Sequence, residues 1–288
     1  MSEALHFLII DGYSQKSRDA LEAAGMQMAW RLYADMLLQN LPNATYDVLL
    51  PSDKGTNNPS TNDLLKYAGI LWTGCNLTIY DTENPSVRSQ IELAKQVFEI
   101  GNPSFGSCWG VQMAAVAAGG EVKLNPKGRE MGLARKVFLT KEAKNHPMYF
   151  GKPSVFEAYI SHDDIVTKIP SGAILMASNY FAEVQALVVK HKNGEFWAVQ
   201  YHPEYNLNEM ASLIVAREER LTKGGFFKGK EDFSSYVENL KALHKDPTRK
   251  ELRWQLSIDD DVLDPNVRQC EFINWINHLV KPSAGVSG

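Results

Sequence analysis

Three side chains in this chain have types and spacing suited to covalent catalysis, and the first is Cys108. It lies in Gly-Ser-Cys-Trp-Gly-Val-Gln (106–112), after a short apolar run and before an alanine-rich stretch typical of a helix. A nucleophile on a tight strand-to-helix turn is presented to its substrate, and the unpaired N–H groups at a helix start favour a thiolate. The sequence therefore predicts a nucleophile elbow with sulfur at its tip.

His202 and Glu204 supply the other two groups. They follow the hydrophobic run 196–201, within Val-Gln-Tyr-His-Pro-Glu (199–204). Side chains just past a strand leave the sheet at its carboxyl edge, where open α/β sheets bind ligands. An imidazole there can take the thiol proton and return it to a leaving amine, while Glu204 orients the ring. A lone cysteine or strand-end histidine is usually structural, but the combination indicates a Cys-His-Glu triad.

Other residues that could do chemistry give weaker signals in the sequence. Cys270 falls in an amphipathic helical pattern and is predicted to be core, whereas Cys75 is expected near the site but has no evident base. His162 with Asp163 and Asp164 offers fewer converging ligands than a cation needs, and the acidic run 259–261 is typical of a solvated turn. We expect no metal and no other cofactor.

The elements that must position these residues alternate between strand and helix. Apolar runs at 5–10, 46–50, 69–74 and 103–105 predict strands, and periodic patterns at 20–41 and 86–100 predict helices. This alternation favours an α/β fold with a doubly wound, mostly parallel sheet and helices on both faces. Past the elbow the pattern changes to shorter strands and a closing helix at 208–221. The strands are expected at 134–140, 156–160, 174–178, 186–190 and 196–201, the last two joined by a hairpin turn.

The C-terminal part of the chain has a different pattern. Helical spacing recurs at 233–244 and 267–280, with polar turns between. We expect a catalytic domain at 1–223 and a helical C-terminal extension at 224–288. The extension is predicted to pack on the catalytic domain or to form the interface of a homodimer.

Composition excludes several classes of partner. The 288 residues carry a net charge of −4 with mixed signs, and no basic stretch is interleaved with aromatic residues, so a nucleic-acid surface is not indicated. No run approaches the roughly 20 apolar residues of a membrane helix. Three cysteines without framework spacing, and no leader pattern, indicate a cytoplasmic protein without a membrane partner.

With these motifs placed, residues 5–220 resemble a class I (triad) glutamine amidotransferase domain, which has a flavodoxin-like fold. Four segments carry the resemblance in order: Leu-Trp-Thr-Gly (71–74), Gly-Ser-Cys-Trp-Gly-Val-Gln (106–112), Ser-His-Asp-Asp-Ile-Val (161–166) and Val-Gln-Tyr-His-Pro-Glu (199–204). The resemblance implies an enzyme that hydrolyses a glutamine side-chain amide.

The resemblance also implies roles for five further residues. Gly74 and Trp109 match the positions whose backbone N–H groups form the oxyanion hole, which stabilises the charge that develops on the amide oxygen. Gln112 matches a residue that helps hold the glutamyl end of the substrate. Ser161 and His162 match a segment whose backbone contacts the glutamyl α-amino or carboxylate group. The plain alternatives are a helix-surface residue for Gln112 and a strand-end turn for the other two.

Two departures from the family pattern bear on function. The segment 13–27 is longer than the corresponding loop, and its first part is expected either to border whatever lies beyond the scissile amide or to be a surface excursion. No nucleotide-phosphate loop is present, so the chain lacks the machinery of an ATP-driven synthetase. The leading hypothesis is hydrolysis of a γ-glutamyl amide through a γ-glutamyl thioester, with release of glutamate and ammonia or an amine. The alternatives are a glutaminase subunit serving a separate synthetase and a non-catalytic binding protein.

Overall fold

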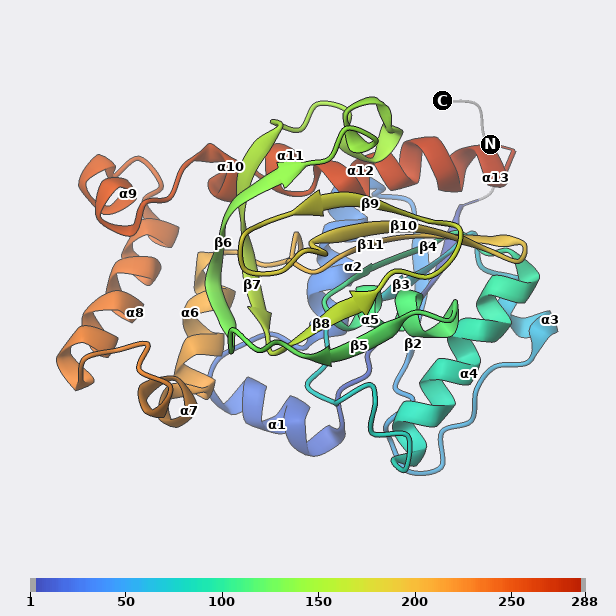
Figure 1. Cartoon of the computed structure of the whole chain (residues 1–288), viewed down its shortest axis with the longest axis horizontal. Coiled ribbons are helices and arrows are strands. Elements are labelled where there is room, and N and C mark those ends of the chain that lie inside the picture. The colour runs from blue at the N-terminus through green and yellow to red at the C-terminus, as the bar shows by residue number, and fades with distance from the viewer. Residues whose placement is uncertain (1–3, 286–288) are drawn as a thin grey trace.

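A computed structural model describes residues 4–285, in which a mixed nine-stranded sheet has helices on both faces (Figure 1). Its first five strands in spatial order are parallel, and the remaining pairings are antiparallel. The doubly wound α/β fold expected from the sequence is confirmed. In spatial order the strands are β2 (Thr45–Leu49), β1 (His6–Ile10), β3 (Gly69–Trp72), β4 (Ser104–Ser107), β11 (Gly194–Val199), β10 (Ala186–His191), β9 (Ala173–Ser178), β6 (Glu130–Leu139) and β7 (Val155–His162).

Alternate residues of β1 point to opposite faces of the sheet and so show how it is covered. Phe7 and Ile9 belong to the hydrophobic cluster that includes α2 (Ala29–Asn40), and Leu8 and Ile10 to the cluster that includes α4 (Pro85–Ile100) and α5 (Trp109–Ala117). A strand buried on both faces is typical of a central parallel sheet. The short helices α3 (Thr61–Leu64), η1 (Ala143–Asn145) and η2 (Pro147–Tyr149) lie in the connections.

The expectation of one helix over 20–41 is wrong. The structure has α1 (Gln15–Ala23) and then α2, and the chain turns between them at Gly25, whose φ is +85°. A left-handed residue of this kind ends a helix, and glycine adopts it without a steric penalty. The turn lets α1 run separately, beside the carboxyl edge of the sheet (Figure 1).

A second, two-stranded sheet was not expected from the sequence. It pairs β5 (Glu121–Leu124) with β8 (Asp164–Lys168) in antiparallel fashion. These strands are short and largely polar, so their patterns are too weak to distinguish from loops. Leu124 and Asp164, at the paired ends, lie beside the candidate site described below.

The C-terminal helices pack on the sheet and continue its core. Phe272 and Trp275 of α12 lie with ring centroids 5.4 and 5.9 Å from that of Phe105 in β4. A dimer interface and the domain boundary at 223/224 stay predictions. In residues 4–285 no helix combines the length and the apolarity needed to cross a membrane. The helices after β11 are α6 (Leu207–Ala216), α7 (Glu218–Lys223), α8 (Lys230–Lys245), α9 (Lys250–Leu256), α10 (Asp260–Leu263), α11 (Pro265–Arg268), α12 (Cys270–Trp275), the π-helical turn η3 (Ile276–Val280) and α13 (Lys281–Ser283).

Candidate active site

Cys108 lies on a strained turn between β4 and α5. Its φ of 51° and ψ of −93° are unusual for a residue with a side chain, and strain of this kind persists only where the surroundings enforce it. Here the Cys108 N–H donates to the carbonyl of Val199 in β11, at 2.8 Å. Glycines make room for the turn: a Cβ at Gly106 would lie 2.9 Å from Cα of Gly110 and from the carbonyl oxygen of Trp72. The local geometry is that of a nucleophile elbow.

The imidazole of His202 is held in one orientation just beyond β11. Its Nδ1 lies 2.7 Å from Oε1 of Glu204, and the ring of Tyr205 stacks on it with centroids 4.1 Å apart. Gly74 shows how close the ring is to the cysteine. A Cβ on that residue would lie 2.9 Å from Cε1 of His202 and 3.8 Å from Cβ of Cys108. The structure thus brings the three predicted triad residues together, with Gly74 against two of them.

The electrostatics favour a charged His202. Burial opposes the imidazolium, but the Glu204 carboxylate and a hydrogen bond with Cys108 outweigh it and raise the pKa of His202 to about 10. An imidazolium next to a thiol favours the thiolate, the reactive form. Burial raises the pKa of Cys75, the other thiol at this edge, and so keeps that sulfur protonated. Of these two thiols, Cys108 is therefore the one placed for nucleophilic attack.

A hydrogen-bonded relay behind Glu204 was not expected from the sequence. The hydroxyl of Ser107 donates to Oε1 of Glu204 at 2.9 Å, and the hydroxyl of Tyr33 donates to Ser107 at 2.8 Å. Burial and the nearby Glu204 carboxylate raise the pKa of Tyr33, which keeps it a donor. Ser107 stands inside the elbow motif and could have been suspected. Tyr33 comes from α2, 74 residues earlier in the chain, and carries no local signal.

The residues expected to bind the amide lie near Cys108. Trp109 is the first residue of α5, so its N–H has no acceptor within the helix, and Gly74 lies beside His202 and Cys108. Gln112 is 4% exposed, and its Oε1 has no hydrogen-bond partner among the described residues. The carbonyl oxygen of Ser161 lies 3.7 Å from Sγ of Cys108. A cavity of about 190 Å³ is lined by Cys108, Gln112 and Ser161.

The side chain of His162 has other partners. Its Nδ1 lies 2.9 Å from the carbonyl oxygen of Asp164, and its Nε2 lies 2.9 Å from a carboxylate oxygen of Glu130. Both ring nitrogens are therefore engaged within the protein. The expected role of His162 rests on its backbone, which remains a prediction. No group of three His, Cys, Asp or Glu side chains suited to a metal ion occurs in the described chain.

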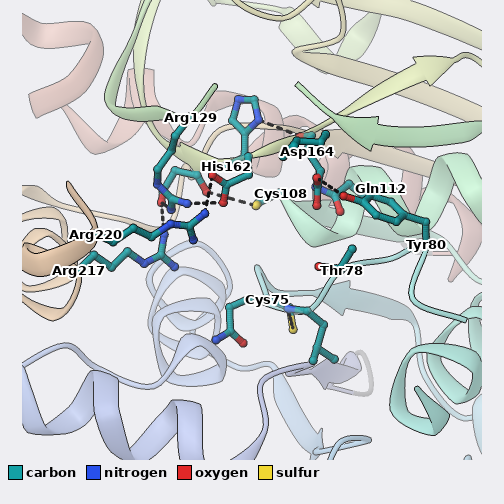
Figure 2. Close-up of a pocket in the computed structure, with 15 residues that line it drawn as sticks. Cys75, Thr78, Tyr80, Cys108, Gln112, Arg129, His162, Asp164, Arg217 and Arg220 are labelled. Atoms are coloured by element: carbon teal, nitrogen blue, oxygen red, sulfur yellow. Dashed lines mark hydrogen bonds and ion pairs between the residues drawn. The ribbon is translucent and has the colours of Figure 1, made fainter. Parts of the chain in front are cut away.

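Three arginines on one side of this cavity were also missed (Figure 2). Arg129 and Arg217 both donate to the hydroxyl of Ser161, and Arg129 and Arg220 share the carboxylate of Asp163. One carboxylate facing three guanidinium groups leaves this side positively charged. Figure 2 shows Gln112 and Tyr80 on the other side of Cys108. Arg217 and Arg220, three residues apart near the start of α7, gave a weak sequence signal; Arg129 gave none.

An α/β fold with a cysteine elbow and a buried histidine–glutamate pair is the arrangement expected of a class I glutamine amidotransferase. The family described as glutamine amidotransferase class-I matches residues 37–219. The chain belongs to this family.

Individual relatives agree with that assignment. A γ-glutamyl-L-1-hydroxyisopropylamide hydrolase from a Pseudomonas species is 32% identical over 98% of this chain and 95% of its own length. A GMP synthase from Lactobacillus delbrueckii is 30% identical over 52% of this chain but only 26% of its own. The crystal structure of a glutamine amidotransferase from Thermotoga maritima shares the fold, with a TM-score of 0.65 at 20% identity over 91% of this chain and 99% of that one.

Proposed function

We propose that this protein hydrolyses a γ-glutamyl amide, using Cys108 as nucleophile, His202 as proton carrier and Glu204 as orienting carboxylate. The observation that carries the proposal is the elbow: a strained cysteine, beside a histidine whose Nδ1 is 2.7 Å from a buried carboxylate. Similarity over nearly the whole chain to a γ-glutamyl-L-1-hydroxyisopropylamide hydrolase supports the same chemistry. The product acid is glutamate, and the leaving group is ammonia or an amine.

The first half-reaction forms a thioester. The thiolate of Cys108 attacks the γ-carbonyl carbon, and the N–H groups of Gly74 and Trp109 stabilise the negative charge that develops on oxygen. His202 gives its proton to the amide nitrogen, the C–N bond breaks, and the amine leaves. Gln112 and the backbone at Ser161 hold the glutamyl end during these steps.

The second half-reaction restores the enzyme. Water attacks the γ-glutamyl thioester while His202 takes a proton from it. The C–S bond breaks, glutamate leaves, and the thiolate and imidazolium are regenerated. Glu204 holds the ring in the tautomer that these transfers require.

The test is a comparison of two cysteine variants on glutamine and a panel of γ-glutamyl amides. Because triad members act as a unit, Cys108→Ala is expected to lower kcat by at least about 10⁴-fold with an unchanged fold. Cys75→Ala removes the neighbouring thiol and is expected to keep activity within about tenfold of the original, since its thiol is not the reactive one. A glutamine-like electrophile should label Cys108, with the site found by peptide mass spectrometry. Retained turnover in Cys108→Ala, or labelling of Cys75, would overturn the assignment.

The same panel tests the glutaminase-subunit alternative, which similarity to part of a GMP synthase favours. A glutaminase subunit is expected to act on glutamine, slowly, and to speed up when a synthetase is added. A stand-alone hydrolase is expected to turn over substituted γ-glutamyl amides without a partner. Tight binding without product would instead support a binding protein that keeps the fold.

A further inference from the structure

The cavity that contains Cys108 is too small for a whole substituted amide. Its volume of about 190 Å³ is below the range of about 300–1,000 Å³ usual for ligand sites. A second cavity of about 560 Å³ lies beside it, between α1 and the α6–α7 junction. The two cavities share Asn76, Arg217 and Arg220 in their linings. We call them the inner and the outer cavity.

The outer cavity carries more positive than negative charge. Lys16, Arg217 and Arg220 line it, and Glu219 is the acidic residue among its lining. Glu219 is already paired with Lys223, at 2.6 Å. In the described part of the chain the side chain of Arg217 takes part in no ion pair and donates only to the neutral hydroxyl of Ser161. The guanidinium of Arg217 and the ammonium of Lys16 are therefore available to an anion.

The segment 13–27 builds one wall of the outer cavity. Asn76, two residues after Gly74, donates from Nδ2 to the hydroxyl of Ser17 at 3.1 Å, which ties α1 to the loop beside the elbow. Arg18 is turned away, since it pairs with Asp53 at 2.7 Å and donates to the carbonyl of Tyr13. Lys16 remains exposed at the cavity.

We propose that the outer cavity binds the leaving amine and selects amines that carry a carboxylate. This inference rests on the proposed hydrolysis of a γ-glutamyl amide. With the scissile carbon at Cys108, the unpartnered oxygen of Gln112 suits the α-ammonium of the glutamyl group, which places that group in the inner cavity. The amine then extends past Asn76 into the outer cavity. There Lys16, Arg217 and Arg220 offer charge-assisted hydrogen bonds to an anionic group.

Two matched substrates test the selection. γ-Glutamyl-L-alanine and γ-glutamyl-L-alaninol share a skeleton and differ only in a carboxylate against a hydroxymethyl group on the leaving amine. The second compound is the γ-glutamyl-L-1-hydroxyisopropylamide in the name of the Pseudomonas relative, so the expected preference sets this chain apart from that relative. The unmodified protein is expected to have a kcat/KM at least about tenfold higher for γ-glutamyl-L-alanine, mainly through KM, because charge-assisted hydrogen bonds are about twice as strong as neutral ones. Release of glutamate is the readout for both substrates.

Variants of residues that line the outer cavity test whether the preference for a carboxylate arises there. Arg220→Gln and Lys16→Gln alter exposed residues, and Asp163 keeps Arg129 as its partner when Arg220 is changed. Each variant is expected to bring the ratio of the two kcat/KM values towards one. Lys241→Gln, which removes an exposed cation from α8, outside both cavities, is the matched control and should leave the ratio unchanged.

The outcomes separate this inference from the proposed function. Equal kcat/KM for the two substrates in the unmodified protein would overturn the anionic subsite while leaving the hydrolase intact. Equal losses for both substrates in Arg220→Gln and Lys16→Gln would also overturn it, because the cations would then hold the shared glutamyl part. Failure to hydrolyse either substrate, with no labelling of Cys108, would instead remove the proposed function.

Discussion

Tyr201 and His202 are neighbours at the end of β11, yet they enter two buried polar networks of different design. The His202 network consists of His202, Glu204, Ser107 and Tyr33. The Glu271 network contains Tyr201 and Tyr149, with Glu271 and Lys152, and it joins α12 to the sheet. In that network the hydroxyl of Tyr201 donates to Glu271, and Lys152 pairs with the same carboxylate at 3.0 Å.

The two networks differ in how completely their charges are satisfied. Lys152 donates to Glu271 and to the carbonyls of Val267 and Arg268, and both oxygens of Glu271 accept hydrogen bonds. Among the described residues, Oε2 of Glu204 has no partner. In the Glu271 network both charges have their hydrogen-bond partners, so the network holds α12 to the sheet. In the His202 network the carboxylate of Glu204 is incompletely satisfied and lies near the strained Cys108, so its charge acts on His202. Changes to the Glu271 network should therefore affect stability, and changes to the His202 network should affect rate.

The largest expected effect is on rate, in Glu204→Gln. The amide keeps the size of the carboxylate but removes its charge and can fix the wrong tautomer of His202. By analogy with triad carboxylates, kcat should fall by about 10⁴-fold. Near pH 10 and above, where the raised pKa of His202 no longer contributes to stability, thermal unfolding should change little, because Gln can still accept from Ser107. Steady-state assays and a melting curve check both parts, and a large loss of stability with little loss of rate would reverse the contrast between the networks.

The pH dependence sharpens the same prediction. The pKa of His202 is about 10 in the folded protein, against burial, because Glu204 and Cys108 favour its charged form. The stability gained from this raised pKa is fully present below the unfolded value of 6.5 and is lost as the pH rises towards 10. In Glu204→Gln the pKa of His202 should fall. The alkaline limb of kcat/KM should therefore move to lower pH, measured on the residual activity.

The next largest effect is on stability, in Lys152→Met. Removing one partner of a buried ion pair leaves the other charge uncompensated, which costs about 3–5 kcal/mol in the free energy of unfolding. Lys152 and Glu271 have side-chain exposures of 1% and 0%, so solvent cannot compensate. Denaturant unfolding measures the loss. The kcat of the folded fraction should stay within about twofold, because the site is on the other network.

A double variant provides the control for this prediction. Lys152→Met combined with Glu271→Gln removes both charges and should lose less stability than Lys152→Met alone. Additive losses in the double variant would show that the pair is not coupled and would contradict the role given to the Glu271 network.

The fold and the proximity of Cys108, His202 and Glu204 could be predicted from sequence because their signals are local. The apolar run of β1 and the alternation of strands and helices indicate the parallel half of the sheet. The elbow motif and the segment containing His202 and Glu204 each follow a strand, and parallel strands bring their carboxyl ends to one edge. The two motifs could therefore be expected to lie side by side without knowing how the helices pack on the sheet.

The remaining parts of the site depend on packing, which a single sequence does not encode locally. Tyr33 joins the relay only because α2 lies against β4, and Arg129 meets Arg217 only where β6 and α6 approach Ser161. The break between α1 and α2 was missed because the apolar spacing continues through Gly25. Its left-handed φ is a backbone property that periodicity does not report.

The smallest expected effect compares one hydroxyl from each network. Tyr33→Phe and Tyr149→Phe both remove a buried hydroxyl that lies 2.8 Å from its partner, on Ser107 and Tyr201 respectively. Each should cost about 1 kcal/mol of unfolding free energy.

Only the Tyr33 variant should also affect catalysis. Without the Tyr33 hydroxyl, the Ser107–Glu204 hydrogen bond loses its support, and kcat should fall by about threefold to tenfold with an unchanged KM. Tyr149→Phe, with the same chemical change in the Glu271 network, should leave kcat unchanged. If both variants lower kcat equally, the hydroxyl acts through general stability, and the separation of the two networks fails; if only Tyr33→Phe does, the relay extends to α2.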